Sequence, residues 1–179
     1  MDRFLGTIVP LSSQQLLKRA RGVSFLLLDV DGVLTDGKVT FTSDGHEVKS
    51  FDIQDGHGLK QLARAGVGIG LLSGRSSPIL DRRAKELEID EVHQGVADKL
   101  VFYEALIARR GLRDQDVAYV GDDAPDLPVL KRVGLAVAVR NAHATVKRSA
   151  HHVTAKRGGE GAVREITDLL LRARGLTPR

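Results

Sequence analysis

Short apolar runs alternate with amphipathic stretches along most of this 179-residue chain. The runs are nearly continuous in their apolar character, which predicts strands of a sheet that is covered on both faces. We expect strands at residues 25–28, 67–72, near Val92, 117–120 and 135–139. We expect helices at residues 13–21, 58–64, 78–87, 99–110, 125–132 and 162–174, the third with Ser77 as N-cap and Pro78 in its first turn. The alternation predicts an α/β fold in one domain, residues 1–179: a doubly wound parallel sheet flanked by helices.

One segment departs from this alternation. Residues 39–42 and 47–51 have strand character, and Ser43-Asp44-Gly45 lies between them. An Asp-Gly pair between two such runs predicts a β-hairpin. We therefore expect a small β-hairpin between the first strand and the next helix.

Acidic and hydroxyl side chains stand where apolar runs end. Asp29 closes the first run, and Asp31 points the same way two residues later. Ser73 follows the second run, and Asp122 follows residues 117–120. The carboxyl ends of parallel strands form the ligand crevice of such sheets. Because a buried unpaired carboxylate is costly, Asp29 is expected to be paired or metal-bound, which suggests a nucleophile with an acid/base beside it.

The order of these residues resembles the haloacid dehalogenase superfamily of aspartate-nucleophile phosphatases. The matching motifs are Asp29-Val30-Asp31-Gly32-Val33-Leu34-Thr35-Asp36-Gly37, Leu71-Leu72-Ser73-Gly74-Arg75, Lys99, and Gly121-Asp122-Asp123-Ala124-Pro125-Asp126. Each motif alone is also compatible with an ordinary loop, cap or solvated helix residue. The resemblance implies that Asp29 attacks phosphorus to form an aspartyl-phosphate and that Asp31 transfers protons. It also implies that Ser73 and Lys99 bind the transferring phosphoryl group.

The resemblance further implies a Mg²⁺ cofactor, held by Asp29, Asp122 and the backbone carbonyl of Asp31. Two carboxylates about 4 Å apart repel each other by roughly 4 kcal/mol at an effective dielectric of 20. A hard cation with oxygen ligands removes that repulsion.

A narrower resemblance rests on three features together. These are the hairpin in place of a cap domain, the segment Phe51-Asp52-Ile53-Gln54-Asp55-Gly56-His57-Gly58, and Gly158-Gly159-Glu160-Gly161-Ala162-Val163-Arg164-Glu165. They resemble the 3-deoxy-D-manno-octulosonate 8-phosphate phosphatase family, whose members are capless homotetramers that cover one another's sites and make an acidic sugar of lipopolysaccharide. The implied substrate contacts are Asp31, Asp52, Ile53, Gln54, Asp55, Gly56, Lys60, Arg75, Arg83, Lys99 and Asp123. Lys60 stands where an arginine is expected, so it keeps the charge but loses bidentate geometry.

Other functions remain open at this point. A nine-carbon sialic-acid-type phosphate has a similar acid end and is the leading alternative substrate. A second alternative is a noncatalytic tetramerisation module, which would be expected to lose the acidic residues that this chain keeps. A third is a phosphoreceiver domain, which would not need Asp31.

The glycine-rich segment, residues 157–165, is expected to fold over a neighbouring subunit's site, with its glycines supplying mobility. On that hypothesis, replacing Gly158 and Gly159 by alanine changes turnover while the melting temperature stays nearly constant. A plain linker is the alternative.

Composition and charge limit the kinds of partner that this chain is expected to bind. The net charge is +4, but only 4% of residues are aromatic and the basic residues are scattered, so no nucleic-acid partner is expected. The chain has no cysteine, so thiolate metal sites and disulfides are excluded. Residues 4–11 lack signal-peptide character and no apolar run reaches the ~20 residues of a membrane helix. We expect no membrane partner, a cytoplasmic location and a small anionic sugar phosphate as substrate.

Overall fold

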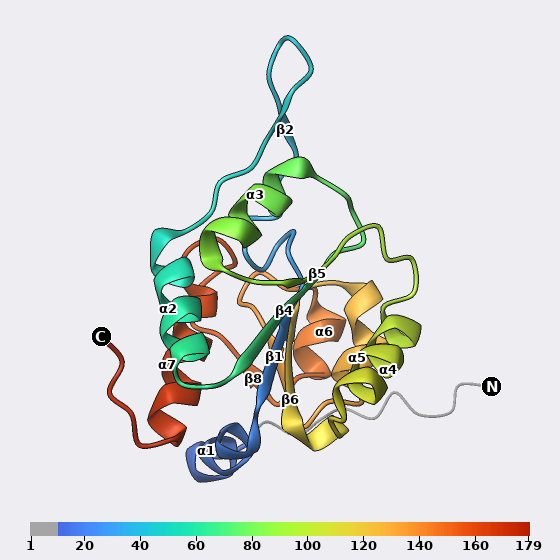
Figure 1. The fold of residues 1–179 in the computed structure, drawn as a ribbon. Coiled ribbons are helices and arrows are strands. Elements are labelled where there is room, and N and C mark those ends of the chain that lie inside the picture. The colour runs from blue at the N-terminus through green and yellow to red at the C-terminus, as the bar shows by residue number, and fades with distance from the viewer. Residues whose placement is uncertain (1–10) are drawn as a thin grey trace, which may run out of the picture.

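A six-stranded, all-parallel sheet forms the centre of the computed structural model, which describes residues 11–179 (Figure 1). The prediction made for residues 4–11 therefore lies, except for Leu11, outside the described residues. The strands run in the order β5-β4-β1-β6-β7-β8. Their bounds are Phe25–Leu28 (β1), Gly68–Leu72 (β4), Glu91–His93 (β5), Val117–Gly121 (β6), Leu135–Ala138 (β7) and His152–Val153 (β8).

The order of the strands shows where a ligand would bind. From β1 the chain moves outward through β4 to β5, and then returns to the other side of β1 for β6, β7 and β8. The direction therefore reverses between β1 and β6, which pair directly from Phe25 with Val117 to Leu28 with Val120. In open α/β sheets, ligands bind at such a reversal, beyond the carboxyl ends of the strands.

Helices cover both faces of the sheet, as the continuous apolar strands require. Helices α2 and α7 lie side by side on one face, whereas α4 and α5 lie on the other (Figure 1). The helix bounds are Ser13–Gly22 (α1), Ile53–Arg64 (α2), Pro78–Leu87 (α3), Lys99–Arg110 (α4), Leu127–Leu130 (α5), Ala144–Arg148 (α6) and Ala162–Ala173 (α7). The four residues of β1 are at most 2% exposed, which confirms a doubly covered central strand. No helix within residues 11–179 is both long and apolar enough to cross a membrane.

The expected elements agree with the structure except in a few places. Helix α2 begins at Ile53 rather than residue 58, because the Asp52 carboxylate accepts a hydrogen bond from Gln54 N and caps it there. The helix expected at residues 125–132 is a 3-10 turn, Ala124–Asp126, followed by the short α5. The elements α6 and β8 were not predicted. Ser77 precedes α3 as expected, but its side chain does not cap the helix.

The hairpin is present, although its paired part is short. Strands Thr40–Phe41 (β2) and Glu47–Val48 (β3) pair in antiparallel fashion, and Gly45 turns the chain with a φ of 86°. The hairpin projects from the body of the molecule beyond α3 (Figure 1). Phe41 on this arm is 62% exposed.

Candidate active site

A cavity of about 450 Å³ opens at the carboxyl ends of β1, β4 and β6. It gathers seven residues that the sequence marked as functional: Asp29, Asp31, Ser73, Arg75, Lys99, Asp122 and Asp123. Residues that lie far apart in the sequence therefore meet where the sheet order reverses.

Lys99 lies at the centre of a buried ionic network. Its ammonium group lies 2.7 Å from Asp29 Oδ1 and 2.7 Å from Asp126 Oδ1. Lys99 occupies the first turn of α4, where the Asp98 side chain accepts hydrogen bonds from two backbone N–H groups and fixes the start of the helix. The lysine is only 6% exposed, so solvent screens these charges weakly.

Asp126 is a site residue to which the sequence analysis gave no role. Its Oδ1 also accepts a hydrogen bond from the Tyr119 hydroxyl at 2.7 Å, and its Oδ2 accepts from the N–H groups of Asp122 and Asp123. It therefore orients Lys99 and shapes the turn that carries Asp122. Its position four residues after Asp122, within the same acidic motif, was the available signal.

The acidic side chains of the site are costly to ionise together. Burial and then the neighbouring Asp126 carboxylate raise the pKa of Asp29 to about 6. Burial and then Asp29 and Asp126 raise the pKa of Asp122 to about 8. Burial lowers the pKa of Lys99, but the two adjacent carboxylates outweigh it, so the net pKa is raised and the lysine stays charged.

The donor set fits a hard divalent cation. Carboxylate oxygens of Asp29, Asp122 and Asp126 lie within 4.8 Å of one another, and oxygen ligands are those that Mg²⁺ prefers. Both oxygens of Asp126 already accept hydrogen bonds, from Lys99 and Tyr119 and from two backbone N–H groups. Asp29 and Asp122 are therefore the carboxylates available to a cation. A cation between them would offset the burial and the repulsion that raise their pKa values.

The loop after β1 depends on close backbone packing. Gly32 has a φ of 95°, and a Cβ there would lie 2.1 Å from Asp122 Oδ2. Thr35 is buried, and its hydroxyl oxygen accepts hydrogen bonds from the N–H groups of Gly32 and Gly37. Any side chain at position 32 would displace the Asp122 carboxylate.

The glycine-rich segment packs against this same loop of its own chain. Asn141 links the two, because its amide donates to Gly32 O and accepts from Gly158 N, and Gly159 N donates to Val33 O. A Cβ on Gly158 would lie 1.8 Å from Gly32 O. Gly158 and Gly159 permit this close contact, so the expectation that both can be replaced without loss of stability is wrong. Closure of the segment over a neighbouring subunit's site stays a prediction.

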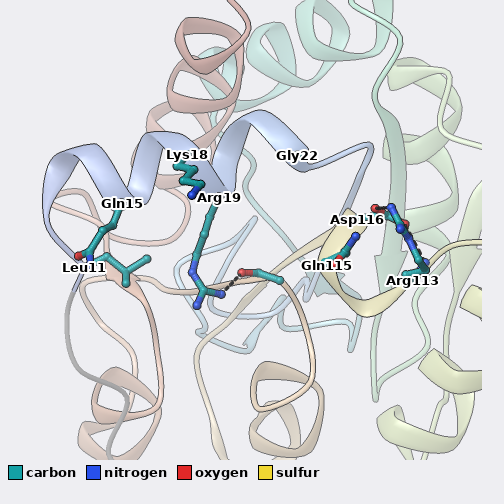
Figure 2. A pocket seen from close by; sticks show the side chains of 9 residues that line it. Leu11, Gln15, Lys18, Arg19, Gly22, Arg113, Gln115 and Asp116 are labelled. Carbon is teal, nitrogen blue, oxygen red and sulfur yellow. Dashed lines mark hydrogen bonds and ion pairs between the residues drawn. The ribbon is translucent and has the colours of Figure 1, made fainter.

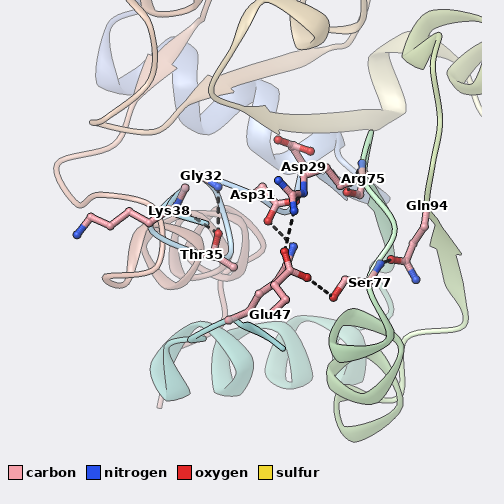
Figure 3. Close-up of polar contacts among 12 residues, drawn as sticks. Asp29, Asp31, Gly32, Thr35, Lys38, Glu47, Arg75, Ser77 and Gln94 are labelled. Carbon is pink, nitrogen blue, oxygen red and sulfur yellow. Dashed lines mark hydrogen bonds and ion pairs between the residues drawn. The ribbon is translucent and has the colours of Figure 1, made fainter. Parts of the chain in front are cut away.

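Two hairpin residues reach the site, and the sequence analysis gave neither a role. The Lys49 ammonium forms an ion pair with Asp31 Oδ1, and the Lys49 side chain is only 4% exposed. Glu47 accepts hydrogen bonds from Arg75 Nη2 at 2.8 Å and from Ser77 Oγ at 2.9 Å (Figure 3). Nothing in the sequence pattern pointed to these contacts, because they join segments 18 to 30 residues apart.

The remaining residues marked as substrate contacts, Asp52, Ile53, Gln54, Asp55, Gly56, Lys60 and Arg83, are not among those that line this cavity. Asp55 is buried and accepts a hydrogen bond from Arg164 N, in the first turn of α7. Lys60 pairs with Glu88 at 3.1 Å, and the Arg83 guanidinium lies over the Phe51 ring. Ile53 is 84% exposed.

A larger cavity of about 670 Å³ lies at the opposite end of the sheet (Figure 2). It is lined by residues of α1 and of the turns before β6 and β7, among them Arg19, which donates a hydrogen bond to Gly134 O. Ligands of open α/β sheets bind at the carboxyl ends of the strands, so the smaller cavity is the candidate active site.

Comparisons with known proteins identify the family of this chain. Residues 89–166 match the family model of the haloacid dehalogenase-like hydrolases. The chain is 41% identical, over 90% of its length and 86% of the relative's, to 3-deoxy-D-manno-octulosonate 8-phosphate phosphatase from Yersinia pestis. It is also similar in structure to a probable YrbI family phosphatase from Pseudomonas syringae, with a TM-score of 0.89 and 48% identity over 90% of this chain and 92% of that one. The octulosonate phosphatase of Moraxella catarrhalis, solved with magnesium, phosphate and the sugar acid, gives a TM-score of 0.88 and 38% identity over 90% of this chain and 93% of that one.

Proposed function

Because the chain belongs to the 3-deoxy-D-manno-octulosonate 8-phosphate phosphatase family of the haloacid dehalogenase-like hydrolases, we propose that it hydrolyses this sugar phosphate to the free sugar acid and phosphate, with Mg²⁺ as cofactor. The observation that carries the proposal is the Asp29–Lys99–Asp126 network beside Asp31 and Asp122 in one cavity. The product would serve lipopolysaccharide synthesis, as the family's does.

The positions of the side chains support the following reaction. Asp29 Oδ1 is held by Lys99, which leaves Oδ2 to attack phosphorus and form an aspartyl-phosphate. Asp31 protonates the departing sugar oxygen and then takes a proton from the water that hydrolyses the aspartyl-phosphate. Ser73, Lys99 and the other donors of the cavity bind the phosphoryl oxygens.

A bound Mg²⁺ would supply positive charge for the phosphoryl group and the attacking carboxylate. Asp29 and Asp122 would hold it, together with the Asp31 backbone carbonyl that the family resemblance implies. Lys99 alone cannot balance the carboxylates of Asp29, Asp122 and Asp126 together with a dianionic phosphate group.

We further propose a homotetramer in which neighbouring subunits complete the site. Apolar side chains stand exposed along the hairpin and at the start of α2: Val39 at 49%, Phe41 at 62%, Val48 at 42% and Ile53 at 84%. Large apolar side chains exposed on a projecting arm are candidates for burial in a protein interface. Ile53 and Gln54 are exposed, and Asp52, Lys60 and Arg83 are partly exposed, so these residues would reach a neighbour's substrate, whereas Asp55 and Gly56 are buried in their own subunit. Sedimentation that finds a fully active monomer at assay concentration would refute this arrangement.

The proposed activity is tested by phosphate release from the eight-carbon octulosonate phosphate and from a nine-carbon sialic-acid-type phosphate, each with and without Mg²⁺. We expect Mg²⁺-dependent release with a preference for the eight-carbon substrate. Asp29→Asn should abolish turnover and aspartyl-phosphate trapping while the protein stays folded. No release from either substrate would favour a noncatalytic assembly module, and preference for the nine-carbon substrate would change the assignment.

A cytoplasmic location and a single domain over residues 1–179 stay predictions.

A further inference from the structure

The two oxygens of the Asp31 carboxylate have different surroundings. Oδ1 is paired with the Lys49 ammonium at 2.5 Å. Oδ2 is buried and accepts no hydrogen bond from the described residues, and Arg75 Nε lies 4.0 Å away. A buried carboxylate oxygen without a donor is uncommon and calls for an explanation. Asp31 lines the cavity, and because Oδ1 is paired with Lys49, Oδ2 is the oxygen left without a partner among the described residues.

Lys49 is placed firmly enough to orient this carboxylate. Its side chain is 4% exposed, and ordering a lysine side chain costs conformational entropy, so such burial requires a compensating contact. A second contact anchors the same strand of the hairpin, because Glu47 accepts from Arg75 and from Ser77 (Figure 3). The hairpin is therefore fixed to the body at two points, by Lys49 at Asp31 and by Glu47 at Arg75 and Ser77.

We propose that Lys49 is a positioning residue for proton transfer: it holds Asp31 by Oδ1 so that Oδ2 alone exchanges the proton with the substrate. This inference rests on the proposed phosphatase activity. In the first step the Asp29 oxygen bonds to phosphorus, the bond from phosphorus to the sugar oxygen breaks, and that oxygen takes the proton of Oδ2. In the second step water bonds to phosphorus, its proton goes to Oδ2, and the bond to Asp29 breaks, which restores both aspartates.

The test uses the leaving group as its readout. A primary alkoxide needs protonation to depart, whereas p-nitrophenolate departs readily without it. We expect Lys49→Met to lower kcat on the octulosonate phosphate by about 10²-fold and kcat on p-nitrophenyl phosphate by less than about tenfold. A merely structural role would lower both equally. Lys38→Met is the matched control, because Lys38 lies in the same connection with a side chain that is 79% exposed, and it should leave both rates unchanged.

Three further measurements test whether Lys49 acts through Asp31. In an Asp31→Asn background, Lys49→Met should have no additional effect, because the two residues act as a unit. The chain has no cysteine, so Lys49→Cys can be aminoethylated at that position alone, and this should restore the rate on the alkyl substrate. If Lys49→Met does not fold, Lys49→Gln removes the charge but keeps a donor, and it should show the same leaving-group dependence to a smaller degree.

Equal losses on the two substrates, no loss on either, or no recovery after aminoethylation would overturn the proposal. Failure of the proposed function is a separate outcome: the unmodified protein would then release no phosphate from the octulosonate phosphate. The comparison of variants could still be made with any alkyl phosphate that the protein hydrolyses.

Discussion

Replacing Gly158 by alanine should impair both stability and catalysis, because it disturbs the support of the Asp31 loop. The added Cβ would lie 1.8 Å from Gly32 O, 2.5 Å from Gly32 C and 3.0 Å from Thr35 O. All three are backbone atoms, so no flexible side chain can move aside. The φ of Gly158 is not positive, and the expected effect is therefore purely steric.

The size of the effect follows from that distance. Carbon and oxygen need about 3 Å even in a close contact, so the loop or the glycine-rich segment must retreat by about 1 Å. Overpacking of this kind costs about 1–3 kcal/mol of unfolding free energy, and for a chain of this length each kcal/mol lowers the melting temperature by about 2–4 °C. A misplacement of about 1 Å at a reacting group can cost about 10²-fold in rate.

The assay measures the melting temperature and kcat of Gly158→Ala beside those of a control, Gly161→Ala. Gly161 lies in the same segment and has a φ of 91°, but among the described residues nothing lies within 4 Å of a Cβ there. The control should lose roughly 1–2 kcal/mol of stability through backbone strain while kcat is retained. A Gly158→Ala protein with unchanged melting temperature, or with kcat no lower than that of the control, would refute the close-contact reasoning.

Three further predictions concern the buried charges and the exposed arm. Without metal, the folded protein binds protons at Asp29 and Asp122 more tightly than the unfolded chain does, so its melting temperature in EDTA should fall as pH rises from about 4 to about 8. Mg²⁺ should reverse a loss on the order of a few kcal/mol, and a flat profile in EDTA would contradict the raised pKa values. Asp126→Ala should lower the unfolding free energy by about 3–5 kcal/mol in denaturant titrations, because a buried lysine, a tyrosine and two N–H groups lose their acceptor. The control, Asp90→Ala, removes an exposed carboxylate and should change the unfolding free energy by less than about 0.5 kcal/mol. Ile53→Glu should shift sedimentation toward smaller species and lower kcat/KM, and an unchanged fully active tetramer would argue against an interface there.

Local patterns predicted most of the fold. Helix α4 begins and ends where expected, because Asp98 caps it and Gly111 ends it with a φ of 64°. Strand β1 was placed correctly, because only a doubly covered strand is apolar at every position. The short elements α6 and β8 carry too few apolar residues for a periodic signal.

The candidate site was predictable only where its residues belong to sequential motifs. The cavity gathers Asp29, Asp31, Ser73 and Lys99, because each follows a strand or opens a helix at one edge of the sheet. The contacts of Lys49 could not be predicted, since they depend on the path of a projecting hairpin. The glycines of the segment were interpreted as mobile, because a close approach to a distant backbone leaves no local signature.

The contact between Gly158 and the loop after β1 also bears on the order in which the site is assembled during synthesis. The loop emerges from the ribosome before the residues that hold it in place, because Asn141 and Gly158 follow it by more than 100 residues. Helix α7, which Asp55 joins to α2 through Arg164 N, is made later still. A nascent chain can pair β1 with β4 before it can position Asp31. The sheet can therefore begin to form before the loop that carries Asp31 is fixed, and a growing chain that has not yet reached Gly158 lacks that support.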